Sequence, residues 1–223
     1  MRTRRPSNDF IFDPSLVLYL PFWKLDGASF MSKDAYGHLA TVIGALWTPQ
    51  GRTFDGIDDN INCGTSTVLK FTTQKFTISA WVKVTSFTAG ASSILMNGTE
   101  NTAGYWFLLN DNGRISIRTY QAGAGQGTVS TANDVTTDVW CNIMAVRSGT
   151  SVTLYKNGSA LTLTEIGVHL DPVAAAENCL IGIHVNLSSY PFRGTIGEVR
   201  LYNRALNPME VQRNYLATKW RYA

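Results

Sequence analysis

Residues 76–84 read Phe76-Thr-Ile-Ser-Ala-Trp-Val-Lys-Val84. Apolar residues occupy every second position of this stretch, and Thr77, Ser79, Trp81 and Lys83 fill the positions between them. An alternation with period two is typical of a β-strand, because successive side chains of a strand point to opposite faces of the sheet. The stretch therefore predicts a strand with one buried face.

Similar segments recur along the chain. They are Leu16–Leu20, Ser92–Met96, Tyr105–Asn110, Arg114–Tyr120, Trp140–Arg147, Val152–Lys156, Asn178–Ile183 and Thr195–Tyr202. Asn112-Gly113 and Asn157-Gly158 stand between such segments, and Asn-Gly pairs favour the tight turns of β-hairpins. Many short strands joined by tight turns predict an all-β fold, an antiparallel two-sheet jelly-roll β-sandwich.

One helix is expected, at the end of the chain. Asn207 can cap its first turn, Pro208 fits the first helical position, and Glu210 occupies the capping-box position. We predict a short amphipathic helix over about Pro208–Ala217. The glycine-rich stretch Gly123–Gly127 is expected to be a loop within the domain.

Length and composition predict one globular domain. The chain has 223 residues, of which 44% are hydrophobic and 16% charged, so it can bury a core. Its net charge of +3 is carried by Arg2, Arg4 and Arg5, because the other 16 cationic residues balance 16 acidic ones. We expect residues 1–10 to be a flexible basic arm and residues 11–223 to form the domain. A nucleic-acid-binding domain needs a cluster of cationic residues, and the sequence shows none, so we expect no nucleic-acid partner. No apolar run is long enough to span a membrane or to act as a standard signal peptide.

The cysteines give no redox or metal motif. Cys63, Cys141 and Cys179 are widely spaced and lack a nearby cysteine or histidine partner. We expect buried free thiols, and neither a disulfide framework nor a zinc site.

Five segments, in this order, carry a family resemblance. They are Leu16–Phe22 with Asp34-Ala-Tyr-Gly-His38, Arg52–Asp59, Phe76–Val82, Leu154-Tyr-Lys-Asn-Gly158 and Phe192–Leu206. Together they resemble the concanavalin A-like jelly-roll superfamily, in particular its laminin G-like branch, over about Leu16 to Leu216. The resemblance implies the same sandwich fold, while the superfamily includes lectins, adhesion modules, glycosidases, lyases and virion components, so it only narrows the function.

The carboxylates do not match a glycosidase of this fold. A retaining enzyme needs two carboxylates about 5 to 5.5 Å apart. None of the five glutamates has an acidic neighbour two or four residues away, and the Glu-x-Asp-x-x-Glu signature of laminarinase-like relatives is absent. His184 is the one histidine at a predicted strand end, and a surface or capping role is favoured over catalysis in a lyase. We therefore expect no enzyme, with a polysaccharide hydrolase or lyase as the third choice.

A cluster of aspartates suggests calcium. Asp55, Asp58 and Asp59 lie close together in the sequence, and calcium prefers several oxygen ligands, although Asp-Gly and Asp-Asp also form ordinary turns. In relatives, an acidic residue before the Glu-Val-Arg of the last strand can help to bind calcium, whereas Gly197 stands there in this chain. If calcium binds, we expect Asp34 and Asp58 to be ligands.

The Asn112-Gly113 hairpin predicts a binding face. In a two-residue turn, Phe107 pairs with Arg118 and Tyr105 with Tyr120, so that one face carries aromatic rings and arginines and the other is apolar core. A three-residue loop would invert the faces. The predicted ligand-binding residues are Tyr105, Phe107, Arg114, Arg118 and Tyr120. Such a face can stack on sugar rings and hold hydroxyl or carboxylate groups; alternatively, a loop covers the rings and the arginines are solvated.

These observations favour a non-catalytic carbohydrate-binding module for a polysaccharide or cell-surface glycan. The alternative is a structural or adhesion protein of a virion surface, with other virion or surface proteins as partners. Either role predicts an extracellular or virion-surface location.

Overall fold

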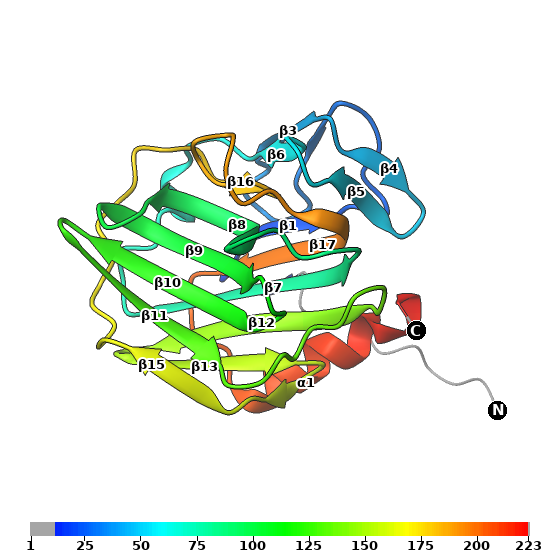
Figure 1. Cartoon of the computed structure of the whole chain (residues 1–223). Coiled ribbons are helices and arrows are strands. Elements are labelled where there is room, and N and C mark those ends of the chain that lie inside the picture. Colours follow the sequence, from blue (N-terminus) through cyan, green and yellow to red (C-terminus); the bar gives the residue numbers. More distant parts are fainter. Residues whose placement is uncertain (1–11, 223) are drawn as a thin grey trace.

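The computed structural model describes residues 12–222, so the basic arm expected over residues 1–10 lies outside the described part. Two antiparallel sheets pack face to face as a β-sandwich (Figure 1). The predicted all-β jelly-roll class is thereby confirmed. No helix among the described residues has the length and apolar character needed to cross a membrane.

The first sheet has eight strands. Seven follow one another in the order β14 (Ser159–Ala160), β13 (Ser151–Lys156), β12 (Cys141–Ser148), β7 (Lys75–Val84), β17 (Arg193–Tyr202), β5 (Gly51–Asp55) and β4 (Leu46–Thr48). The eighth, β1 (Leu16–Pro21), pairs with β17 beside this path. The first and last long strands of the chain are therefore neighbours.

The second sheet has nine strands. Their order is β15 (Leu163–Ile166), β11 (Ala124–Ser130), β10 (Ile115–Gln121), β9 (Ala103–Asn110), β8 (Ala91–Thr99), β16 (Leu180–Ile181), β6 (Asn60–Asn62), β3 (Leu39–Ile43) and β2 (Ser29–Met31). Figure 1 shows β8 to β11 as one layer and β7, β12 and β13 as the other. The apolar faces of the two layers form one continuous core that includes Phe76, Ile78, Val82, Tyr105, Phe107 and Ile117.

The C-terminal helix α1 (Pro208–Thr218) begins as predicted. Asn207 accepts a hydrogen bond from the Glu210 backbone N–H and donates its own backbone N–H to the Glu210 carboxylate, which completes a capping box. Val211 and Ala217 pack with Met144 of β12 in a second apolar cluster, so α1 covers the outer face of the eight-stranded sheet. Two short 3₁₀ helices, η2 (Thr67–Leu69) and η3 (Lys219–Arg221), also occur in the described part of the chain.

Two local expectations are wrong. Gly123–Gly127 is not all loop, because residues from Ala124 onward form β11 beside β10. The hairpin at Asn112-Gly113 has a three-residue loop: the Asn110 N–H donates to the Arg114 carbonyl, and only Gly113 of the loop has positive φ (81°). By contrast, Asn157 and Gly158 both have positive φ, as a two-residue turn of the expected type requires.

Candidate functional site

The outer face of the nine-stranded sheet carries its own apolar cluster, separate from the core. Its centre is Trp106, which exposes 1% of its surface and donates a hydrogen bond from Nε1 to Ser93 Oγ (2.9 Å). His184 meets the indole edge-on at 5.2 Å between ring centroids, and Tyr190 lies at 5.2 Å from it. The loop after β16 thus covers the middle of this face.

The three-residue loop moves the pairing of β9 and β10 by one position. Arg118 lies opposite Trp106, and Ile117 lies opposite Phe107. Because side chains alternate, this shift turns Tyr105 and Phe107 into the core, where both are fully buried. The prediction that these two rings belong to the binding face is therefore wrong, and Trp106, expected in the core, faces outward.

The three other predicted residues do share the outer face. Arg114 Nε donates to the Ser130 carbonyl, which places it at the loop end of the sheet. The Arg118 guanidinium lies 5.6 Å from the Trp106 ring centroid, and its Nη1 is 3.8 Å from Glu100 Oε1. The side chain of Arg118 is 39% exposed, so it can reach a ligand in solution.

Tyr120 supports this site rather than offering a stacking surface. It exposes only 2% of its area, and burial together with the neighbouring Glu100 carboxylate raises the pKa of its phenol, against the effect of Arg118. The hydroxyl therefore stays protonated at neutral pH. The expectation that Tyr120 stacks on a sugar ring does not fit this burial.

A cavity of about 170 Å³ opens beside Arg118. It is lined by Asn101, Arg118, Tyr120, Gly125, Gln126, Gly127 and Ile166. The two glycines lie directly opposite Tyr120 and Arg118 on β11, and a Cβ atom at Gly125 would come within 2.9 Å of the Tyr120 ring. Glycine at these positions leaves bare backbone beside the guanidinium.

A second cavity, of about 240 Å³, lies on the same face. It is lined by Ile43, Asn60, Asn62, Glu177, Asn178, Leu180, Val185 and Leu187. Leu180, Met96, Trp106 and Arg118 are neighbours in one row across β16, β8, β9 and β10. A strand spacing of about 4.8 Å places Leu180 about 14 Å from Arg118 along this row. The two cavities therefore flank the covered Trp106.

The covering loop is held by its own hydrogen bonds. His184 Nδ1 accepts from the Asn186 backbone N–H (3.3 Å), and the Asn186 side chain accepts from the N–H groups of Ser188 and Ser189. Leu187 and Tyr190 have positive φ of 58° and 53°, a strained conformation for these residue types. His184 is thus buried and accepts a backbone N–H group of this loop, so of the surface or capping roles expected from the sequence the structure agrees with the capping role.

The three aspartates of the β5–β6 turn lie close together in space, as they do in the sequence. Asp55, Asp58 and Asp59 each bring a carboxylate oxygen within 4.8 Å of the others. Asp59 also accepts the Asp55 N–H (2.8 Å). Burial raises the pKa of Asp59, and the charges of Asp55 and Asp58 raise it further. A cation placed here would relieve this repulsion.

Asp34, the other predicted calcium ligand, lies elsewhere in the fold. One of its oxygens accepts the Tyr19 N–H (2.9 Å), and the other accepts the N–H groups of Tyr36 and Gly37. These bonds fasten the turn after β2 to β1. Within the described residues, the structure groups Asp58 with Asp55 and Asp59 and does not group it with Asp34.

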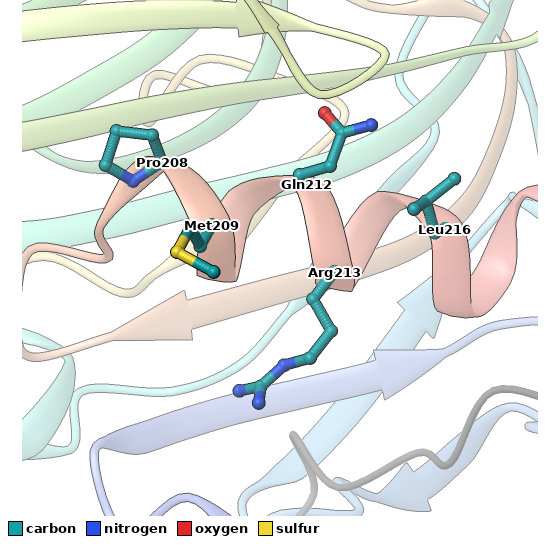
Figure 2. A pocket seen from close by; sticks show the side chains of 5 residues that line it. All are labelled: Pro208, Met209, Gln212, Arg213 and Leu216. Atoms are coloured by element: carbon teal, nitrogen blue, oxygen red, sulfur yellow. The ribbon is translucent and has the colours of Figure 1, made fainter.

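A third depression runs along α1 on the opposite side of the molecule. It has a volume of about 510 Å³, and its lining residues, Pro208, Met209, Gln212, Arg213 and Leu216, all project from the one helix (Figure 2). Met209 is 82% exposed. This apolar helix face has no place in the glycan-binding prediction.

Comparison with solved structures gives proteins of the same fold. A sialidase from Trypanosoma rangeli in complex with sialic acid superposes with a TM-score of 0.69 and 18% identity, covering 93% of this chain and 33% of that one. The binding domain of botulinum neurotoxin serotype G gives a TM-score of 0.69 at 16% identity, covering 90% of this chain and 50% of that one. The binding domain of Paraclostridial Mosquitocidal Protein 1 gives a TM-score of 0.65 at 18% identity, covering 90% of this chain and 52% of that one.

The chain thus spans about a third to a half of the length of these solved structures, and such low identities establish the fold alone. A search of curated protein sequences gives no match. Residues 40–212 match the family model Laminin_G_3, described as the concanavalin A-like lectin/glucanases superfamily. The match covers most of the chain and includes every residue that lines the two cavities of the outer face. The chain therefore belongs to the concanavalin A-like lectin/glucanase superfamily.

Proposed function

We propose that the chain is a non-catalytic, lectin-like module that binds a polysaccharide or cell-surface glycan on the outer face of its nine-stranded sheet. The observation that carries the proposal is the pair of cavities in one row of this face, both lined by polar and apolar groups, with Arg118 exposed at one of them. Guanidinium, amide and carboxylate groups beside apolar side chains suit the mixed surface of a sugar. The separation of about 14 Å suits an extended oligosaccharide.

The cavity linings favour binding over hydrolysis. Among the described residues, Glu177 is the carboxylate that lines the second cavity, and the first cavity is lined by none. A glycosidase of the usual kind places two carboxylates on either side of one bond. The sialidase among the solved structures shares the fold at low identity and does not assign its activity to this chain.

An Arg118→Ala variant tests the proposal. On an array of immobilised oligosaccharides, the parent should bind a defined set of glycans, and the variant should bind them at least about tenfold more weakly. This expectation follows because a hydrogen bond to a charged group contributes about 1.5–3 kcal/mol and about 1.4 kcal/mol is a tenfold change. The melting temperature of Arg118→Ala should stay near that of the parent, because the ion pair that the variant loses, between Arg118 and Glu100, is partly exposed to solvent.

Two further variants sharpen this test. Arg213→Ala removes the same group from α1 on the other side of the molecule and should leave binding unchanged. Gly127→Leu should block the first cavity without removing a polar side chain, because a Cβ atom there would make only ordinary contacts of 3.5 Å with the Arg118 side chain and the Ile117 carbonyl oxygen. Equal glycan binding by the parent, Arg118→Ala and Gly127→Leu would contradict a glycan-binding site at the first cavity of this face.

An assembly role is the second candidate, and the exposed apolar face of α1 favours it. A parent protein that binds no glycan on the array and increases in mass with concentration in solution would support this role instead.

We also propose that the Asp55–Asp59 turn binds calcium. Millimolar calcium should raise the melting temperature over that in chelator, since a ligand of the native state at 100 times its dissociation constant adds about 2.7 kcal/mol. Asp58→Asn should abolish this rise. Asp34→Asn should lower the melting temperature equally with and without calcium, because Asp34 binds backbone N–H groups. Identical melting curves of the parent in calcium and in chelator would contradict calcium binding and mean that the three aspartates only form a turn.

A further inference from the structure

Cys63 and Cys179 lie opposite each other on neighbouring strands. Cys63 directly follows β6, and Cys179 directly precedes β16. The Cys63 N–H donates to the Cys179 carbonyl (2.9 Å), and the Cys179 N–H donates to the Gly64 carbonyl (2.9 Å). These bonds place Cys63 and Cys179 side by side, next to the pair formed by Leu180 and Asn62, and the pairing shifts by one residue at Gly64.

Both side chains point to the same side of the sheet. Cys63 and Cys179 belong to the core between the two sheets, where 2% and 0% of their surfaces are exposed. Opposite residues of antiparallel strands have Cα atoms about 4.5 to 5.5 Å apart, which falls within the range of about 4.4 to 6.8 Å that disulfides require. A bond between the two sulfurs therefore needs little movement of the backbone.

The two thiols also affect each other directly. A hydrogen bond with Cys179, complete burial and the nearby Asp34 carboxylate raise the pKa of the Cys63 thiol well above its ordinary value. Since the thiolate is the reacting species, the folded pair should react slowly with an external oxidant. Oxidation is then fastest while the chain folds or while the two-residue strand β16 opens locally.

We propose that Cys63 and Cys179 are a modification site at which a small-molecule disulfide, of the oxidised glutathione class, forms a cross-strand disulfide. One cysteine thiolate attacks the oxidant, forms a mixed disulfide and releases one reduced glutathione. The second cysteine thiolate then attacks the protein sulfur of the mixed disulfide and releases another. Two protein S–H bonds and one S–S bond of the oxidant are replaced by one protein S–S bond and two glutathione thiols.

The new bond would fasten the strands that frame the second cavity. Asn62 and Leu180, which both line that cavity, are the sequence neighbours of Cys63 and Cys179. The three cysteines are free thiols in this structure. Cys141 is buried at the start of β12 in the other sheet and lies outside this pair.

The test refolds the reduced chain in a mixture of oxidised and reduced glutathione. The protein is then acidified, denatured and treated with a maleimide, and its intact mass is measured. The reduced chain should take up three maleimides, and the refolded chain should take up one, at Cys141. Peptide mapping should find the Cys63 and Cys179 peptides linked. The oxidised form should melt several degrees higher than the same protein with reductant.

Single variants supply the controls. Cys141→Ser should take up two maleimides when reduced and none after refolding in the glutathione mixture. Cys63→Ala should keep two reactive thiols and lose the effect of reductant on melting. The proposal is wrong if the refolded parent takes up three maleimides, if it carries bound glutathione without an internal link, or if mapping links Cys141. The Cys141→Ser result decides the matter even if Cys63→Ala does not fold.

Discussion

Replacing Trp81 with alanine is expected to lower the free energy of unfolding by about 3–5 kcal/mol, the usual cost of removing a buried aromatic side chain. Trp81 lies in β7 but faces away from the core between the sheets. It is 3% exposed, and it stacks on Tyr222 at 4.4 Å and on Tyr215 at 5.7 Å between ring centroids. Its Nε1 also donates to Thr218 Oγ1 (2.9 Å). Chemical denaturation followed by circular dichroism would measure the loss.

The contacts of Trp81 make the effect specific to the C-terminal segment. Trp81→Phe should cost less than Trp81→Ala, because it keeps the ring contacts and loses the hydrogen bond to Thr218. Trp47→Ala is the matched control, since Trp47 is 39% exposed on the edge strand β4. An unfolding free energy of Trp81→Ala equal to that of the parent would mean that α1 and η3 do not depend on this ring.

The same residue shows what period-two patterning can and cannot predict. The alternation over residues 76–84 correctly predicted β7 and its apolar core face. It assigned Trp81 to the more polar face, where Tyr215 of α1 and Tyr222 near the end of the chain bury it. The period-two pattern identifies the face of a strand that packs against the other sheet. Whether another segment buries the opposite face depends on tertiary contacts, which the pattern does not contain.

The candidate site was predicted only in part, for a definable reason. A loop one residue longer than assumed reversed the outward face of β9 but not that of β10, so Arg114, Arg118 and Tyr120 kept the predicted side and Tyr105 and Phe107 did not. Asn-Gly pairs occur in two-residue turns and also at the end of three-residue loops with glycine last. The sequence contains both forms, and the apolar residues of β9 fit either face.

Other residues of the site come from segments with weak signals. Asn101 lies in the turn between β8 and β9, and Ile166 ends the short edge strand β15. One signal was present: Gly123-Ala-Gly-Gln-Gly127 places glycine at every second position, which fits a strand with one side free of side chains as well as it fits a loop. Strands as short as β6 and β16 are too brief to show a period.

Replacing Arg200 with methionine is expected to cost about 3–5 kcal/mol, because it leaves the Glu198 carboxylate buried without its cation. Glu198 and Arg200 form an ion pair on β17, and both side chains are almost completely buried. Burial raises the pKa of Glu198 above its ordinary value, while Arg200 opposes the rise. Urea denaturation of the parent and the variant measures the difference.

The pH dependence of this loss separates a charge effect from a packing effect. Without Arg200, the folded-state pKa of Glu198 should rise further above its unfolded value, so the folded variant holds a proton that the unfolded chain releases. Stability of that kind is present at low pH and is lost as the pH rises through the folded-state pKa. The penalty of Arg200→Met should therefore be larger at about pH 8 than at about pH 5.

The double variant Glu198→Gln with Arg200→Met should recover much of the loss, since no buried charge remains. An equal penalty at both pH values, with no recovery in the double variant, would mean that Arg200 acts through the packing of its side chain against Tyr19 and not through its charge.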